Sequence, residues 1–261
     1  MGTESSDVLF ERRGPVAWVT FNRPHARNAM TFAMYDRLAE ICDEVQGDSD
    51  VRVLVLTGAG DKAFVAGTDI SQFQTFTNPE HALAYEEHLD GVIGRLEGLA
   101  RPTIAAIRGY AVGGGASMAL ACDMRFCTPD ARLGVPIART LGNCLSMTNY
   151  ARLIDLIGPA RAKDLIFRAR MIEAEDLKAV GLANEIVAPD ALESRVQEVA
   201  EQIASHAPLT IQVTKEAIRR ILAHRRLPRA EDLVLKAYMS EDFREGVRAF
   251  LEKRKPEWKG R

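Results

Sequence analysis

The architecture of this chain rests on one segment, IAAIRGYAVGGGASMALACD, at residues 104–123. Its apolar beginning, Ile104 to Ile107, is typical of a buried strand, and three glycines at 113–115 lead into small and apolar residues at helical spacing. Glycines at such a junction let backbone N–H groups approach a ligand, and the helix start adds free N–H groups and a positive dipole end. The segment predicts a strand, a glycine turn and a helix that can receive a negatively charged oxygen. The alternative is that the glycines only let helix and strand pack closely.

A second glycine turn lies in Lys62–Ile70, with the sequence KAFVAGTDI, directly after the strand-like run Val51–Thr57. Two such turns would supply two converging N–H donors. Together with Asn22-Arg23-Pro24 and Asn28-Ala29-Met30 near the start, these residues resemble the enoyl-CoA hydratase/isomerase (crotonase) superfamily. The resemblance extends in order over nearly the whole chain, to the closing segment Phe250–Trp258.

Composition limits the classes of function. The chain has 261 residues, of which 47% are hydrophobic and 27% charged, and this fits one soluble catalytic core with a C-terminal extension. A net charge of −2 gives no basic field of the kind that nucleic acid demands, so we expect no nucleic-acid partner. No apolar run approaches the roughly twenty residues that span a bilayer, and no targeting segment is evident. The four cysteines form no CxxC pair, which favours reduced thiols in a cytoplasmic protein.

The order of predicted elements is that of an α/β protein. Two strands, Val8–Arg12 and Val16–Phe21, precede a helix that Thr31 would cap and Gly47 would stop, and the strand Val51–Thr57 follows. Asn78-Pro79 opens another helix, and the polar segment before it has little to bury, so we expect a substrate-dependent flap at residues 71–81. Later strands are expected at 124–128, 132–136 and 182–187, and later helices at 146–157, 160–168 and 174–180.

From Pro189 onward no convincing strand pattern remains. Helices are expected at 192–205, 208–222, 230–239 and 241–253, which divides the chain into a catalytic core at 1–188 and a helical region at 189–261. A helical tail too small for its own core usually packs on the main domain or on a neighbouring subunit. The resemblance implies a crotonase-like spiral of ββα units whose C-terminal helices form a trimer interface. It therefore implies a homotrimer, or a homohexamer built from two trimers.

The resemblance also implies an acyl-CoA thioester as substrate, with coenzyme A as part of that substrate and no tightly bound cofactor. An acyl thioester that loses an α-proton, or receives a nucleophile at its β-carbon, develops negative charge on the carbonyl oxygen. By resemblance, the donors to that oxygen are the backbone N–H groups of Thr68 and Gly114. Because these donors belong to the backbone, a threonine at 68, where many relatives have alanine, leaves the oxyanion hole intact.

The coenzyme A nucleotide would bind beside the same turn. By resemblance, the backbone at Ala66, Asp69 and Ile70 would face adenine and pantetheine, and the phosphates would lie near Arg23 or Arg27 and near Lys253 of the basic tail. Each arginine could instead be a surface charge, and Asp69 could simply cap the next helix.

The chain departs from the family at the two acid–base positions. Hydratases of the family have glutamates where this chain has Ser117 and Ile137, which puts hydration by two carboxylates in doubt. Arg139 is the most suggestive replacement, as a cation that binds a substrate carboxylate or stabilises an enolate, although it could equally pair with a surface acid. Family decarboxylases also lack the glutamate pair. The other nearby polar candidates are Ser117, Asn143, Tyr85, Glu86, Glu87 and His88.

Other classes of function remain weaker. A serine hydrolase would use Ser117, which would need a histidine base, and the histidines after it are His206 and His224 in the helical tail. The histidines show no HExxH spacing, so no metal site is expected, and residues 58–62 lack the pattern of a P-loop. We therefore expect an enoyl-CoA hydratase-like enzyme. The alternatives are an acyl-CoA decarboxylase, isomerase or thioester hydrolase of the family, or a silent acyl-CoA-binding member.

Overall fold

A computed structural model describes residues 7–223 and 231–261. The strands are β1 (Val8–Arg13), β2 (Val16–Phe21), β3 (Val53–Gly58), β4 (Ala63–Val65), β5 (Thr103–Ile107), β6 (Tyr110–Val112), β7 (Met124–Cys127), β8 (Arg132–Gly134), β9 (Met171–Glu173) and β10 (Glu185–Ile186). The α-helices are α1 (Phe32–Gly47), α2 (Pro79–Gly98), α3 (Gly114–Ala121), α4 (Ile137–Thr140), α5 (Met147–Phe167), α6 (Ala174–Ala179), α7 (Leu192–Ser205), α8 (Pro208–Ala223), α9 (Glu231–Tyr238) and α10 (Glu241–Leu251). Two 3₁₀ helices, η1 (Pro24–Ala26) and η2 (Ile70–Thr75), lie in the loops of this described part.

In the part of the chain that the structure describes, the strands form two sheets. The larger has the order β1-β2-β3-β5-β7-β10, and all its pairs are parallel except the β1–β2 hairpin. The smaller has the order β4-β6-β8-β9 and is parallel except for β8–β9. Parallel pairs need crossover connections, and the helices between successive strands supply them. This confirms the predicted α/β class.

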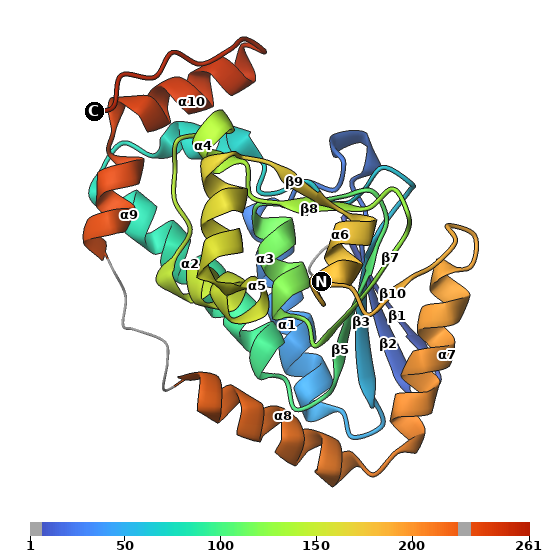
Figure 1. The fold of residues 1–261 in the computed structure, drawn as a ribbon. Helices are drawn as coiled ribbons and strands as arrows, with labels where there is room; N and C mark the ends of the chain where they lie inside the picture. The colour runs from blue at the N-terminus through green and yellow to red at the C-terminus, as the bar shows by residue number, and fades with distance from the viewer. Residues whose placement is uncertain (1–6, 224–230) are drawn as a thin grey trace.

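The inner strands β2, β3 and β5 of the large sheet are buried on both faces, because their apolar side chains point alternately into two separate cores. Val16 and Trp18 of β2 pack with Val53 and Val55 of β3 against α7, whereas the intervening residues belong to the main core beneath α1, α2 and α3. Side chains along a strand point to opposite faces in turn, so a run of apolar residues produces this two-sided burial. Figure 1 shows α7 on one side of the large sheet and α1, α2, α3 and α5 on the opposite side.

Several predicted helix ends are confirmed. Thr31 Oγ1 accepts a hydrogen bond from the Met34 N–H, and Asn78 accepts one from the His81 N–H, so both residues cap the helices that they were expected to begin. The expected break at Gly158 is present as a kink within α5, where Gly158 has φ 77°. The short elements β4, β6, β9 and α4 were not predicted, because three or four residues carry too little periodicity to stand out.

The segment 71–81 is not the polar, weakly packed stretch that was expected. Phe73 is buried, and its ring lies 5.0 Å from that of Tyr85 and 5.9 Å from that of Phe243, which joins η2 to α2 and α10. The ring of Phe76 adds a contact at 5.1 Å from Phe73. Aromatic packing therefore holds this segment, and its assignment as a substrate-dependent flap stays a prediction.

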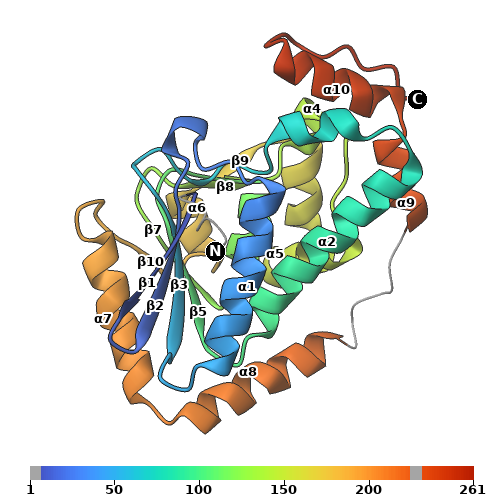
Figure 2. The same cartoon turned by 180° about the vertical axis from the view of Figure 1, so that it is seen from behind.

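The helices of the region 189–261 lie in three separate parts of the molecule. Helix α7 covers the sheet, α9 and α10 lie near the carboxyl ends of the strands, and α8 crosses the opposite end (Figures 1 and 2). The predicted helix at 230–239 begins outside the described residues and is seen from Glu231. None of the described helices combines the length and apolar composition that crossing a bilayer requires. The division at 188/189 stays a prediction.

Candidate active site

A cavity of about 790 Å³ opens at the carboxyl ends of the parallel strands. Its walls come from the loop before α1, the loop between β4 and η2, the start of α3, the middle of α2, the segment around α4, and the C-terminal residues Tyr238, Phe250 and Lys253. Ligands of open parallel sheets bind at this edge, where loops from successive strands meet. The cavity is large enough for an acyl chain and its thioester.

Two glycine turns form one wall of this cavity. Gly67 has φ 107° and Gly113 has φ 52°, a region that favours glycine, and each immediately precedes a predicted donor. A Cβ built on Gly113 would lie 3.9 Å from the Gly67 Cα, so the turns lie side by side. In the described residues, the N–H groups of Thr68 and Gly114 donate no hydrogen bond to the backbone. The structure therefore brings together the two donors that the sequence predicted.

Gly114 is constrained by its neighbours and not by its backbone conformation. Its own φ is not positive, and a Cβ built on it would lie 2.3 Å from the Tyr35 hydroxyl and 3.4 Å from Thr68 Oγ1. The first obstacle to a side chain is thus a buried tyrosine and not strain in the backbone. Gly115 is more tightly enclosed, because its Cβ would lie 2.2 Å from the carbonyl oxygen of Val65.

The side chain of Thr68 anchors the turn at Gly67 to neighbouring helices. Its hydroxyl lies 3.0 Å from the Tyr35 hydroxyl and 2.8 Å from the Tyr85 hydroxyl, and all three side chains are buried. Burial raises the pKa of Tyr35 and of Tyr85, so both stay neutral hydrogen-bonding groups. This cluster joins the turn to α1 and α2 and holds the Thr68 N–H in place.

Ser117 and Ile137 both lie on the cavity, as expected from the resemblance. Ser117 is in the first turn of α3 and Ile137 begins α4, and both are buried. Neither carries a carboxyl group: the two side chains are a hydroxyl and a hydrocarbon.

The structure does not support the role expected of Arg139. Successive helical residues are rotated by about 100° around the axis, so Ile137 and Thr140 of α4 face the cavity while Arg139 faces away from it. Arg139 is exposed and is not among the residues that line the cavity. A short helix that the sequence did not reveal thus directs this cation to the surface.

The cationic residues at the cavity mouth differ in part from the predicted ones. Arg27 and Lys253 are exposed and line the cavity, together with His25. Arg23 does not line it, because its guanidinium is engaged by Asp69 Oδ2 at 3.2 Å and by the Ala29 carbonyl oxygen at 2.6 Å. The expected Arg23 contact with phosphates is therefore replaced by an internal ion pair. Ala66, Asp69 and Ile70 lie on the cavity as predicted, and Asp69 also caps η2 through the Ser71 N–H.

A polar cluster on another wall joins Tyr85, Glu86 and Asn143, which were separate candidates in the sequence, with Tyr238, which was not predicted. Glu86 and Tyr85 project from α2 into the cavity, and Glu86 accepts a hydrogen bond of 2.5 Å from the hydroxyl of Tyr238 in α9. Asn143 donates to the same hydroxyl at 3.2 Å. The remaining candidates lie elsewhere, since Glu87 is exposed and His88 bonds to Asp36 at 2.7 Å.

The alternative chemistries gain no support from the geometry. His206 is exposed at the end of α7 and does not line the cavity with Ser117, and His224 lies outside the described residues. Within residues 7–223 and 231–261, no group of three or more His, Cys, Asp and Glu side chains is arranged to hold a metal ion.

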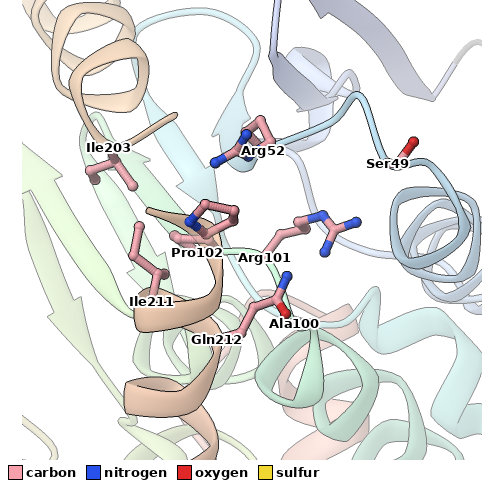
Figure 3. Close-up of a pocket in the computed structure, with 9 residues that line it drawn as sticks. Ser49, Arg52, Ala100, Arg101, Pro102, Ile203, Ile211 and Gln212 are labelled. Atoms are coloured by element: carbon pink, nitrogen blue, oxygen red, sulfur yellow. The ribbon is translucent and has the colours of Figure 1, made fainter. Parts of the chain in front are cut away.

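A second hollow, of about 210 Å³, lies at the opposite end of the sheet beside α8 (Figure 3). Its two arginines are already engaged, because Arg101 donates to the carbonyl oxygens of Val51 and Asp48, and Arg52 donates to that of His206. It is small, and the donors of Thr68 and Gly114 lie at the other end of the strands. It is therefore a packing gap and not a candidate active site.

Comparisons with known proteins match nearly the whole chain. The family model described as enoyl-CoA hydratase/isomerase matches residues 11–261. The chain is 36% identical to the short-chain-enoyl-CoA hydratase of Clostridium acetobutylicum, over 97% of this chain and 98% of that protein.

Solved structures resemble the whole fold. An enoyl-CoA hydratase/carnithine racemase from Magnetospirillum magneticum has a TM-score of 0.80 and 33% identity, covering 98% of this chain and 96% of its own. A methylmalonyl-CoA decarboxylase, in complex with 2-nitronate-propionyl-CoA, has a TM-score of 0.87 and 27% identity. The match covers 97% of this chain and 98% of the decarboxylase chain.

Proposed function

This chain belongs to the enoyl-CoA hydratase/isomerase family, and from that membership we propose that it acts on an acyl-CoA thioester through an enolate held by the N–H groups of Thr68 and Gly114. The observation that supports the proposal is the pair of adjacent turns whose two N–H groups have no backbone acceptor in the described residues. Removing one donor from an oxyanion hole typically costs about 10² to 10³ in rate, so a fixed pair makes a large contribution.

The cavity has the polarity that such a substrate requires. Glu86 is the buried charged residue of its lining in the described residues, Asp69 is half-buried and paired with Arg23, and Arg27 and Lys253 are exposed at the mouth. An acyl chain would occupy the interior, and the phosphates of coenzyme A would meet the cations outside. The backbone at Ala66, Asp69 and Ile70 would then line the path of pantetheine and adenine.

Addition of water to a 2-enoyl thioester is the reaction that we propose first. The relative from Clostridium acetobutylicum is a short-chain-enoyl-CoA hydratase, and the donor pair suits the enolate that forms when water adds to the β-carbon. Because Ser117 and Ile137 supply no carboxylate, hydration would be slower than in relatives with both glutamates, by about 10²- to 10⁴-fold for each group lost.

Decarboxylation is the second candidate, and one observation favours it. The methylmalonyl-CoA decarboxylase structure has a TM-score of 0.87. When a thioester with a carboxylate on its α-carbon loses carbon dioxide, the same kind of enolate forms, and no base is needed to remove an α-proton. The absence of carboxylates at 117 and 137 would also avoid repelling a substrate carboxylate.

A turnover panel tests the proposal. Crotonyl-CoA would be assayed for hydration and methylmalonyl-CoA for carbon dioxide release, with calorimetry to measure binding of each thioester. We expect turnover of at least one substrate class, and Ser117→Ala should leave hydration unchanged. Binding without any turnover would instead favour a silent acyl-CoA-binding protein, and absence of both would contradict the proposal.

A further inference from the structure

Glu86 is unusual among the residues of the cavity. It is 7% exposed, it lies on α2 directly after Tyr85, and Tyr85 bonds to Thr68 at the oxyanion turn. Leu89, one helical turn further along, lines the same cavity. A stripe of α2 thus runs along the cavity wall from the oxyanion turn. Of the two carboxyl groups that line the cavity in the described residues, that of Glu86 is buried, whereas that of Asp69 is half-buried and paired with Arg23.

The two oxygens of Glu86 have different surroundings. Oε1 accepts the hydrogen bond from the Tyr238 hydroxyl, and that hydroxyl in turn accepts one from Asn143 Nδ2. Oε2 accepts no hydrogen bond from the described residues. It is also not one of the fully enclosed polar atoms that lack a partner, which in the described residues are Asn143 Oδ1 and Arg152 Nε. One oxygen is therefore held while the other is available to a molecule in the cavity.

We infer that Glu86 is the acid–base group of this site, taking the place of the carboxylates missing at positions 117 and 137. The inference rests on the proposed function, because it assigns the proton transfers of an enolate reaction. Tyr238 and Asn143 act as positioning residues, since they orient the carboxyl group from α9 and from the segment before α5.

A single carboxyl group is sufficient for the hydration step. As the water oxygen bonds to the β-carbon, Glu86 takes one water proton, and the electron pair of the C=C bond moves toward the thioester, giving an enolate on the carbonyl oxygen. Glu86 then returns the proton to the α-carbon, and the carbonyl and the neutral thioester re-form. The product has gained one water, and Glu86 is again ionised.

The electrostatic surroundings suit this cycle. Burial raises the pKa of Glu86 to about 7, the hydrogen bond from Tyr238 lowers it, and the charge of Asp90 raises it further. The other titratable groups that interact with Glu86 are Tyr35 of α1, Tyr85 of α2, Tyr150 of α5, and Cys144, whose pKa burial raises to about 12. These four stay neutral near pH 7. A carboxyl group that titrates near neutral pH can both accept and return a proton.

A structural role for the Glu86–Tyr238 pair is the competing explanation, since it joins α2 to α9. Glu86→Gln separates the two roles, because glutamine still accepts the hydrogen bond from Tyr238 but cannot carry a proton between substrate atoms. Glu87→Gln is the matched control, since Glu87 is the next residue of the same helix and is exposed.

The experiment measures exchange of the α-protons of butyryl-CoA in deuterium oxide, together with crotonyl-CoA hydration. A saturated thioester cannot add water, so exchange reports only the base and the oxyanion hole. We expect Glu86→Gln to lower exchange and hydration by at least about 10²-fold while calorimetry shows unchanged butyryl-CoA binding, and Glu87→Gln to match the wild type. The pH profile provides an independent readout: the acid limb should lie near pH 7 and move upward in Tyr238→Phe, which lacks the bond that lowers the pKa.

The outcomes separate the inference from the proposed function. Exchange and hydration in the wild type that persist unchanged in Glu86→Gln would overturn the role of Glu86 and leave the proposed function standing. A wild type that binds butyryl-CoA and crotonyl-CoA but neither exchanges nor hydrates would overturn the role of Glu86 and hydration as the reaction, and if it also released no carbon dioxide from methylmalonyl-CoA, the proposed function would be overturned as well. An acid limb that is the same in Tyr238→Phe and wild type would overturn the role of Tyr238 and the assignment of that limb to Glu86.

Discussion

Gly67 and Gly113 each use a positive φ to present the N–H group of the next residue, and this pairing was predictable from the sequence. The glycine turns and the resemblance predict Thr68 and Gly114 as the donors, a prediction open to sequence reasoning because backbone donors depend on local chain geometry. Side-chain roles were less accessible. Whether Arg23 is free depends on Asp69, and the environment of Glu86 depends on Tyr238, 152 residues away in sequence. No local pattern encodes such contacts.

The tight packing at Gly114 gives the first prediction. Gly114→Ala should reduce kcat/KM by at least about tenfold, because the new Cβ displaces the Tyr35 hydroxyl and with it the bond that holds Thr68. Adding Tyr35→Phe removes the clashing oxygen, so the double variant should recover part of the loss. Gly91→Ala is the control, since its Cβ meets no atom within 4 Å. Equal activity of Gly114→Ala and Gly91→Ala would contradict this account of the turn.

The Thr68 hydroxyl gives a second prediction, which concerns stability more than chemistry. Thr68→Ala keeps the backbone donor but leaves the buried hydroxyls of Tyr35 and Tyr85 without their shared partner, at a cost of about 1 to 3 kcal/mol in the free energy of unfolding. Thr68→Ser should cost less because it keeps the hydroxyl. Urea unfolding measures the difference, and kcat should fall far less than the about 10²-fold expected for a lost donor. A stable Thr68→Ala protein without activity would show that the hydroxyl acts on the substrate.

The raised pKa of Glu86 predicts a pH-dependent stability. In the unfolded chain this carboxyl group ionises near 4.5, whereas in the fold it ionises near 7, so folding favours the protonated form. Its contribution to stability is complete below pH 4.5 and is lost as pH rises through 7, by up to about 3 kcal/mol at about 1.4 kcal/mol per pKa unit. Glu86→Gln should therefore gain stability relative to wild type between pH 5 and pH 8 in urea unfolding. If the difference in unfolding free energy between Glu86→Gln and the wild type were the same at pH 5 and at pH 8, this would contradict the burial of an ionisable Glu86.

Among the elements, the long helices and their caps were predictable, and the small sheet was not. Helices α1 and α2 carry cap residues and a full apolar stripe, whereas β4, β6 and β9 span three residues each and carry too little periodicity to stand out. Arg139 illustrates the consequence, because its direction follows from α4, a helix of four residues.

Helix α10 gives a prediction at this level. Glu245 accepts hydrogen bonds from Arg254 at 2.6 and 3.0 Å and from the Glu257 N–H at 3.1 Å, and these arginine contacts hold the pKa of Glu245 well below its usual range. They position the segment that carries Lys253 at the cavity mouth. Glu245→Gln should weaken coenzyme A binding by up to about tenfold, or about 1.4 kcal/mol, with little change in kcat. Calorimetry with Glu231→Gln as the exposed control tests this, and unchanged affinity would mean that α10 does not help bind the nucleotide.

At the level of the molecule, the chain has the crotonase-like α/β fold that its resemblance implied, as the solved relatives confirm. Helix α8 is the part whose packing is incomplete. It contributes no buried residue, and Leu209, Val213, Ile218 and Ile221 are each more than half exposed. An apolar face of this size is typical of a surface covered by another subunit.

We therefore expect a trimer or hexamer that uses α8. Sedimentation of the wild type should show the assembly at micromolar concentration, and Val213→Glu should dissociate it by placing a charge within the apolar face. Gln202→Glu adds the same charge to α7 and should leave the assembly intact. A wild type that sediments as a stable monomer would contradict the prediction.

The position of the bound thioester oxygen distinguishes this account from its alternatives. A crystal structure of the protein with an unreactive acyl-CoA analogue should place that oxygen within about 2.7 to 3.2 Å of both the Thr68 and Gly114 backbone nitrogens, with the acyl chain directed toward Glu86. An oxygen bound only by side-chain hydroxyls, or a thioester seated away from the two glycine turns, would contradict the two-donor oxyanion hole.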